Sequence, residues 1–157
     1  MTQTTVKATT THRAPFGTLT ATWSERGLSS LSFRGGRRAA AGADARARIL
    51  AAALDRYFRS GSWSFSVPLD LGAGTEFDRA VWNALRRIPA GQVRTYGQIA
   101  SVLGKPNASR AVGNACGRNP VPIVVPCHRV VARNGPGGFG LGLGLKRKLL
   151  RLEGVRV

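Results

Sequence analysis

TYGQIASVLGKPNASRAVGNACG, residues 95–117, contains two short helix patterns joined by a turn. Thr95 with Gln98 three positions later is a capping box, which predicts the start of the first helix, and Gly104 predicts its end. After the turn GKPN, a second helix is predicted over ASRAVGNACG, residues 108–117. Two short helices separated by a four-residue turn are typical of a helix-turn-helix.

The second of these helices carries small side chains, whereas helices that read bases in the major groove usually present long polar ones. Its small residues are Ala108, Ser109, Ala111, Gly113 and Ala115, and the main exceptions are Arg110 and Asn114. Small residues allow the helix backbone to come close to the shallow minor groove, where Arg110 can reach into the base stack. Close packing against a neighbouring helix is the other explanation for the same residues.

Apolar periodicity predicts one more helix before this motif. Thr75 and Asp78 form another capping box, and the apolar stripe that follows ends near Pro89. The stripe consists of Phe77, Val81, Trp82, Leu85 and Ile88. The residues expected to face inward from the helix over 95–104 are Ile99, Val102 and Leu103.

The first half of the chain is predicted to contain both strands and a helix. Residues 15–33, PFGTLTATWSERGLSSLSF, alternate apolar and polar side chains around a turn at residues 24–27, which predicts a hairpin. A helix is predicted over residues 43–61, and SWSFSVPLDL, residues 62–71, is predicted to be another strand. The apolar face expected for that helix consists of Ile49, Leu50, Ala53, Leu54 and Phe58.

Two glycines in LGAG, residues 71–74, mark the expected boundary between a domain over residues 1–74 and one over residues 75–157. The whole chain has 24 Lys and Arg against 7 Asp and Glu, a formal net charge of +17 and a pI near 11.8. Residues 75–157 hold the larger share, with 14 basic and 3 acidic residues. This charge indicates a nucleic-acid partner, although an arginine-favouring genome would also produce a basic surface.

The N-terminal sequence and the cysteines argue against several classes of protein. Residues 1–13 lack the apolar segment of a secretion signal, and no window approaches the roughly 20 apolar residues of a membrane span. We therefore expect a soluble cytoplasmic protein with access to chromosomal DNA. The two cysteines, Cys116 and Cys127, form no C-x-x-C pair, which argues against a disulfide framework and a structural zinc site.

The stretch NPVPIVVPCHRVV, residues 119–131, combines three prolines with a cysteine and a histidine. The prolines stiffen the backbone and restrict where the Cys127 sulfur can lie. An unperturbed thiol has a pKa of about 8.5, so a nucleophilic cysteine needs a group to take its proton. Cys127 is therefore either a reactive thiol held in a pocket or a buried structural cysteine, the commoner fate of a cysteine beside Val and Ile.

His128 is the nearest candidate to accept that proton, but neighbours on an extended strand point to opposite sides. A direct bond to Cys127 is then doubtful, and a bridging water is the alternative. A carboxylate would orient the histidine, and Glu153, near the end of the basic stretch LKRKLLRLEG, is the one acidic residue after Asp78. From the residues alone, a solvated charge at a helix end is the simpler interpretation of Glu153.

NPVPIVVPCHRVV, together with RTYGQIA and SRAVGNACGRNP upstream, resembles the O6-alkylguanine-DNA alkyltransferases, or methylated-DNA-protein-cysteine methyltransferases. Residues 15–33 and GGFGLGLGLKRKLLRLEG, residues 137–154, resemble the same family. The resemblance implies an α/β (α+β) chain, with a small ribonuclease-H-like N-terminal domain followed by a winged helix-turn-helix domain. It also implies direct-reversal repair, in which O6-alkylguanine, or O4-alkylthymine, is flipped out of DNA and loses its alkyl group irreversibly to Cys127.

The resemblance assigns catalytic roles residue by residue. Cys127 resembles the acceptor nucleophile, His128 the water-linked base, and Glu153 the carboxylate that orients the base. Asn119 resembles the residue that braces the active-site loop, and Tyr96 resembles the tyrosine that helps to turn the nucleotide.

The resemblance also implies how DNA is bound. Arg110 resembles the finger that fills the vacated base stack. The other residues expected to contact DNA or the base are Tyr96, Ser109, Asn114, Val130, Phe139 and Gly140. No metal or organic cofactor is implied, and the expected partner is double-stranded DNA, bound through its minor groove by a monomer.

Two positions depart from the family's pattern. Phe139 stands where many members have tyrosine, and Leu141 stands where a glycine is usual in the loop that lines the pocket. We therefore expect an altered tolerance for bulky adducts such as benzyl.

Three other classes of function have to be weighed. Alkyltransferase-like proteins bind lesions without repairing them, but they lack the cysteine. A helix-turn-helix regulator needs specific base contacts, for which residues 108–117 are poorly suited. A cysteine hydrolase using Cys127, His128 and Glu153 would turn over repeatedly, whereas an alkyltransferase stops after one equivalent.

Overall fold

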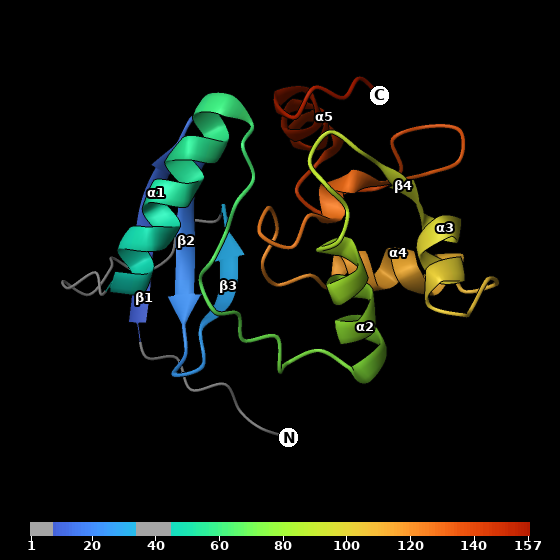
Figure 1. Ribbon diagram of the computed structural model, residues 1–157, viewed down its shortest axis with the longest axis horizontal. Helices are drawn as coiled ribbons and strands as arrows, with labels where there is room; N and C mark the ends of the chain where they lie inside the picture. The colour runs from blue at the N-terminus through green and yellow to red at the C-terminus, as the bar shows by residue number, and fades with distance from the viewer. Residues whose placement is uncertain (1–7, 34–44) are drawn as a thin grey trace. The chain divides into compact units, whose positions relative to one another are not determined.

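The computed structural model describes residues 8–33 and 45–157, and these form the mixed α/β chain that the sequence predicts (Figure 1). The chain divides into two compact units between Ala73 and Gly74, one residue before the expected boundary. Residues 1–7, and the first two positions of the helix predicted over 43–61, lie outside the described residues.

The described residues of the N-terminal unit, 8–33 and 45–73, form an antiparallel sheet and one helix (Figure 1). The strands β1 (Ala8–Ala14), β2 (Gly17–Trp23) and β3 (Leu28–Ser32) lie in the order β1-β2-β3, and α1 (Ala45–Ser60) packs against them. The apolar residues buried in this unit include Leu19, Ala21, Trp23, Leu28, Leu31, Leu50, Ala53, Leu54 and Tyr57. The hairpin predicted over residues 15–33 is therefore confirmed as β2 and β3.

Three details of this unit differ from the sequence prediction. The edge strand β1 was missed because its sequence, ATTTHRA, lacks an apolar alternation. Residues 62–71 form only an isolated bridge to Leu28, and Pro68 in that stretch has no N–H to extend a ladder. On α1, Ile49 is 48% exposed and Tyr57 is buried instead.

The C-terminal unit contains the predicted helix-turn-helix. Its helices are α2 (Glu76–Leu85), α3 (Tyr96–Val102), α4 (Ser109–Gly117) and α5 (Leu143–Leu152), with a single 3-10 turn, η1 (Cys127–Arg129). The short strands β4 (Arg94–Thr95) and β5 (Val130–Val131) pair in parallel. Because α4 contacts both α2 and α3, the three helices form one packed group.

Both predicted capping boxes are confirmed. Thr75 Oγ1 accepts the Asp78 N–H at 3.0 Å, and the Asp78 carboxylate accepts the Thr75 N–H at 3.1 Å. Thr95 and Gln98 make the same reciprocal pair, at 3.1 and 2.8 Å. Each pair satisfies backbone donors that the helix itself leaves unbonded, so the first residues of α2 and α3 are set locally by the sequence.

The apolar face is predicted less well at the helix ends. Val102, the last residue of α3, is 71% exposed, and Ala100 is buried in its place. Ile88 is buried as expected, but it lies in the turn after α2 rather than on the helix. Apolar residues keep their helical spacing in the sequence beyond the last helical residue of α2 and up to the end of α3, so spacing alone overestimates the buried face there.

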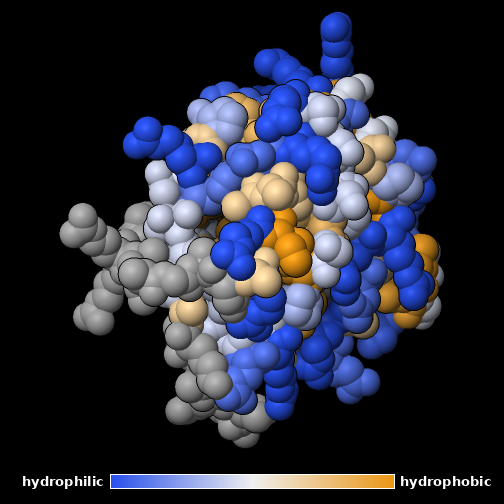
Figure 2. Space-filling view, turned by 60° about the vertical axis from the view of Figure 1, so that its left-hand side comes forward, coloured by the Kyte–Doolittle hydropathy of each residue, from blue (hydrophilic) through white to orange (hydrophobic). Residues whose placement is uncertain are grey.

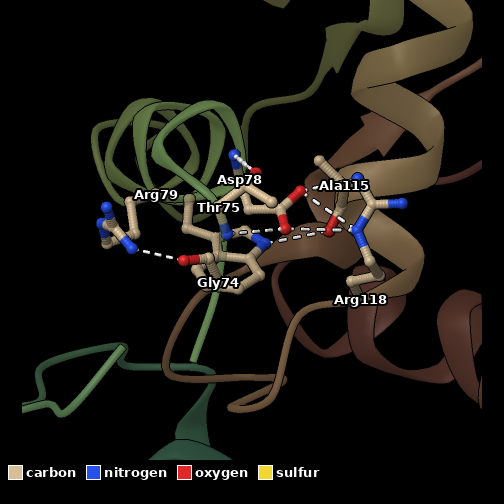
Figure 3. A network of polar contacts seen from close by, with 7 residues as sticks. Gly74, Thr75, Asp78, Arg79, Ala115 and Arg118 are labelled. Carbon is tan, nitrogen blue, oxygen red and sulfur yellow. Dashed lines mark hydrogen bonds and ion pairs between the residues drawn. The ribbon is translucent and has the colours of Figure 1, made fainter. Parts of the chain in front are cut away.

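A network of polar contacts joins the start of α2 to the end of α4 (Figure 3). The Arg118 guanidinium donates to Asp78 Oδ1 at 2.6 Å from Nη2 and at 3.1 Å from Nε. Trp82 Nε1 donates to the Ala115 carbonyl at 2.9 Å. The bond from Arg118 holds the pKa of the nearly buried Asp78 carboxyl below its ordinary value. This network fixes the end of α4, which leads directly into the cysteine-containing loop.

On the face in Figure 2, hydrophilic residues (blue) surround small groups of hydrophobic ones (orange). None of the helices within residues 8–33 and 45–157 combines the length and the apolar character that a membrane span requires.

Candidate active site

The backbone turns sharply just before Cys127. Pro126 has φ −82° and ψ 64°, and the Cys127 N–H donates to the Val125 carbonyl at 2.8 Å, which together define an inverse γ-turn. The chain then enters η1, where the Arg129 N–H donates to the Pro126 carbonyl at 3.0 Å. The extended strand expected at Cys127 and His128 is therefore wrong, because the turn at Pro126 redirects the chain before β5 begins.

Asn119 braces the loop that leads to this turn. Its Nδ2 donates to the Val125 carbonyl at 2.8 Å, and its Oδ1 accepts the Val121 N–H at 2.9 Å. Inside the loop, Ile123 has φ 74°, a left-handed conformation that is rare for a β-branched residue. The Asn119 side chain thus closes a tight loop that holds one strained residue.

Cys127 is the buried sulfur at the end of this loop, with 7% of its surface exposed. Burial raises the pKa of the Cys127 thiol, while a hydrogen bond with Asn119 and the charge of Lys146 act in the opposite direction. Ionisation of this thiol at neutral pH therefore depends on groups around it that favour the anion.

His128 and Glu153 form a buried pair behind the cysteine. Nε2 of His128 lies 2.5 Å from Oε2 of Glu153, and both side chains have no exposed surface. Because a carboxylate only accepts hydrogen bonds, the proton of the neutral imidazole is on Nε2 and Nδ1 carries a lone pair. Burial lowers the pKa of His128, although Glu153 partly opposes this, and Nδ1 has no hydrogen-bond partner among the described residues.

Arg129 is a member of this cluster that the sequence prediction missed. Its Nε donates to Glu153 Oε1 at 2.6 Å, and its Nη1 donates to the Ile88 carbonyl at 2.6 Å. The side chain is fully buried, so the charge-assisted bond to Glu153 is shielded from water. Glu153, the residue that caps the end of α5, is therefore an organised buried carboxylate and not the solvated helix-end charge considered above.

A cavity of about 580 Å³ opens beside the cysteine. The predicted site residues that line it are Tyr96, Ser109, Arg110, Asn114, Cys127, Phe139 and Gly140. His128, Glu153, Asn119 and Val130 are not among its lining residues. The structure therefore separates the predicted residues into a group around the cavity and a group that supports Cys127 from behind.

Helix α4 contributes to both packing and the cavity. Its buried residues are Val112 and Ala115, whereas Arg110 is exposed. A Cβ added at Gly113 would lie 3.8 Å from the Tyr96 ring, an ordinary contact distance. Among the small residues of α4, Ala115 is therefore packed in the interior, whereas Ser109 and Gly113 line the cavity.

Two more residues belong to the cavity region. Cys116 lines the cavity together with Cys127, and burial raises the pKa of the Cys116 thiol to about 12. It therefore stays a neutral thiol at physiological pH. Leu141 is 36% exposed and is not among the lining residues, so its effect on adduct size stays a prediction.

Tyr96 contacts the loop that lines the cavity at Gly138, Phe139 and Gly140. Its hydroxyl donates to the Gly138 carbonyl at 3.4 Å, a long bond, and burial raises its pKa. The hydroxyl is therefore protonated at neutral pH and available as a donor. Within the described residues, no group of three or more His, Cys, Asp and Glu side chains is arranged to hold a metal ion.

Comparison with known proteins identifies the family. Residues 76–155 match the model of the 6-O-methylguanine DNA methyltransferase DNA-binding domain. A methylated-DNA–protein-cysteine methyltransferase of Methanosarcina acetivorans is 43% identical over 148 residues, which cover 90% of this chain and 94% of the relative. The same-named protein of Mycobacterium tuberculosis is 50% identical over 104 residues, or 66% of this chain and 62% of the relative.

Solved structures agree with the sequence comparisons. The crystal structure of Mycobacterium tuberculosis OGT in complex with DNA has a TM-score of 0.81 and 38% identity, over 93% of this chain and 92% of that one. The O6-methylguanine-DNA methyltransferase of Pyrococcus kodakaraensis has a TM-score of 0.63 and 28% identity, over 94% and 98%. The chain belongs to the methylated-DNA–protein-cysteine methyltransferase family.

Proposed function

We propose that this protein repairs O6-alkylguanine in duplex DNA by moving the alkyl group to the Cys127 sulfur, once per molecule. The observation that carries the proposal is a buried thiol at the wall of a cavity of about 580 Å³, followed in the chain by His128, which is paired with Glu153. O4-alkylthymine presents the same kind of alkyl–oxygen bond and is proposed as a second substrate.

The first step is the loss of the thiol proton. Neutral His128 accepts this proton at Nδ1, either directly or through one water, while its Nε2–H donates to Glu153. The imidazolium that forms is stabilised by the Glu153 carboxylate, which Arg129 keeps in place. Burial makes ionisation of the Cys127 thiol unfavourable. The role of the His128–Glu153 pair is therefore to take the thiol proton and leave a nucleophilic thiolate.

The second step is an in-line displacement. A bond forms between the Cys127 sulfur and the alkyl carbon as the bond from that carbon to O6 of guanine breaks, and its electron pair stays with the guanine. Tyr96 donates a proton to the departing base and is reprotonated from solvent, while His128 releases its proton to solvent. A thioether is not readily broken, so the reaction stops after one turnover.

The base must leave the duplex to reach this sulfur. Unstacking costs a few kcal/mol and is less costly for a lesion that pairs badly. The small residues of α4 suit a close approach to the minor groove, and exposed Arg110 is long enough to occupy the vacated stack. Since one chain supplies every group of this mechanism, the protein is proposed to act as a monomer, in the compartment that holds the chromosome.

Counting turnovers separates this reaction from hydrolysis by the same residues. The protein is incubated with an excess of duplex oligonucleotide containing O6-methylguanine, and the repaired guanine is measured per mole of protein. Repair should stop at one equivalent. Continued turnover, or the absence of any repair by folded protein, would contradict the proposal.

A further inference from the structure

A tight turn after α5 brings residues 154–157 back against the end of that helix. Gly154 has φ 86°, a left-handed conformation, and the Val155 N–H donates to the Leu150 carbonyl at 2.8 Å. These are the features of a Schellman motif. A cavity of about 600 Å³ opens at this turn, and its lining residues are Arg147, Arg151, Gly154, Val155, Arg156 and Val157. The turn therefore gathers three arginines around one concave surface.

These three arginines have no side-chain carboxylate to neutralise them. Arg147, Arg151 and Arg156 are all exposed, and within residues 8–33 and 45–157 none of them is in an ion pair. Glu153 is the one acidic residue among residues 79–157, and its buried carboxylate is bonded to Arg129. The cavity therefore offers three unneutralised positive charges to an anion from another molecule.

Helix stability alone does not account for this grouping. A cation in the last turn of a helix is favoured by the helix dipole, which explains Arg151. Arg147 lies four residues earlier on the same face, where two like charges repel each other, and Arg156 lies beyond the helix. In the free protein the grouping is therefore unfavourable, and a bound anion would remove the repulsion.

The backbone of DNA is the anion that fits this surface best. Each guanidinium can bind phosphate oxygens through two parallel hydrogen bonds, so three of them suit neighbouring phosphates of a strand. The rest of the lining, Gly154, Val155 and Val157, has no polar side chain that could read a base edge. Contacts of this kind position DNA without selecting its sequence. DNA is also the polyanion that contains the substrate of the proposed function.

The arginine surface is separate from the cavity beside Cys127. The two cavities share no lining residue. Helix α5 packs against η1, and in the view of Figure 1 η1 lies between α5 and α4. A DNA segment at the arginines therefore need not be the segment that contacts α4.

We propose that Arg147, Arg151 and Arg156 form a second DNA-binding surface, which holds the phosphates of another DNA segment while α4 is bound to the first. A protein that holds two segments at once can pass from one to the other without diffusing freely between them. This inference goes beyond the proposed function, because it depends on DNA binding and not on alkyl transfer.

The test measures how fast a labelled, undamaged duplex leaves the protein at increasing concentrations of unlabelled duplex. A second segment that binds before the first leaves makes this rate depend on the unlabelled duplex, whereas a single DNA site gives a constant rate. For the wild type the rate should rise at least about threefold over a range of about 100-fold in concentration. The combined variant Arg147→Gln, Arg151→Gln and Arg156→Gln should lose this increase. Glutamine is a good helix former, so these exposed changes leave the fold intact.

The matched control removes the same charge from α1. It combines Arg48→Gln, Arg56→Gln and Arg59→Gln, which are also exposed positions, and it should keep the wild-type increase. A wild-type rate that is independent of unlabelled duplex would overturn the proposal. So would an increase that persists in the α5 variant, or an equal loss in the two variants, which net charge alone would explain.

A further series replaces the unlabelled duplex by polyglutamate at the same concentration of negative charge. Polyglutamate should accelerate dissociation far less than duplex DNA does. An equal acceleration would show that the surface fits an acidic protein, and the DNA assignment would be wrong. Because every duplex in these experiments is undamaged, no alkyl group moves, and the result is independent of whether Cys127 accepts one.

Discussion

His128 Nε2 lies 2.5 Å from Glu153 Oε2, and neither side chain has any exposed surface. This contact joins the turn η1 to the residue that caps the end of α5, 25 positions later in the chain. Because Glu153 also accepts a bond from Arg129, its carboxylate is oriented on both oxygens. The pair gives the histidine a defined tautomer and leaves Nδ1 as the acceptor that we propose takes the thiol proton.

Glu153→Gln tests the contribution of this carboxylate. The variant keeps the shape but removes the negative charge, so the imidazolium formed during transfer loses its counter-ion. The rate of transfer should fall by about 100-fold or more. Leaving Arg129 buried without its charged partner should lower the free energy of unfolding by roughly 3 kcal/mol. Single-turnover kinetics and urea unfolding measure the two effects.

Asp55→Asn is the control for that variant, because Asp55 is a carboxylate with 55% of its side chain exposed. It should change the transfer rate by less than about twofold, since surface substitutions are usually close to neutral. An equal loss in the two variants would show that Glu153 has no special role.

The pH dependence of transfer follows from the directions of two pKa shifts. Burial lowers the pKa of His128 below its ordinary value, so the base remains neutral below pH 6.5. The acid limb of the rate profile should therefore have a midpoint below pH 6.5. The unfolded chain binds this proton more readily than the folded one, so stability should also fall as pH drops below 6.5. An acid limb centred above 6.5 would contradict this assignment.

Cys127→Ser separates chemistry from binding. A serine hydroxyl is far less acidic than a thiol, so transfer should be abolished. DNA affinity should remain within about threefold, because the basic residues and not the thiol supply most of the binding free energy. Equilibrium binding at two salt concentrations measures this, and affinity should fall steeply with salt in both proteins. A parallel loss of binding and transfer would contradict the division of roles.

Arg110→Ala tests insertion into the base stack. Without the side chain that occupies the vacated position, flipping costs more, and transfer from duplex DNA should slow about 10-fold or more. Iodoacetamide should react with Cys127 at the wild-type rate, because that reaction needs no flipped base. Arg86→Ala removes another exposed arginine, just after α2, and is the matched control. Equal effects of the two variants on transfer would indicate only a loss of net charge.

Asp78→Asn tests the network that fixes the end of α4. The change weakens the bidentate bond with Arg118 and the cap at Thr75, so the free energy of unfolding should fall by about 1–2 kcal/mol. Because the folded-state pKa of Asp78 is lowered, its contribution is present above pH 4 and is lost as pH falls further. Thermal unfolding measured across this pH range checks both effects. Glu76→Gln, which changes an exposed carboxylate in the same helical turn, should have little effect on it.

Local signals explain how much of the fold could be predicted. The capping boxes at Thr75 and Thr95 are formed within four residues of sequence, and both helices start where they predict. Strand β1 has no comparable signal, because a threonine-rich edge strand resembles a polar tail. The turn at Pro126 ends a loop that the Asn119 side chain closes by hydrogen bonds to Val121 and Val125, and helix or strand periodicity carries no signal for such bonds.

The buried cations were missed for a different reason. Lys146 lies in a stretch that reads as a basic, solvent-facing helix, yet its spacing places it on the same face as Leu149, Leu150 and Glu153. That spacing was the available signal. The sequence around Arg129 contains no such signal. Burial of Arg129 is favourable only because the fold places Glu153 and the Ile88 carbonyl beside it.

The central claim is that the Cys127 sulfur accepts the alkyl group, and peptide-resolved mass spectrometry tests it most directly. After reaction with duplex O6-methylguanine DNA, the peptide containing residue 127 should gain the mass of one CH2 group, in one equivalent, as the lesion disappears. A lesion that disappears while this peptide keeps its original mass, or a methyl group found on Cys116 instead, would contradict the account.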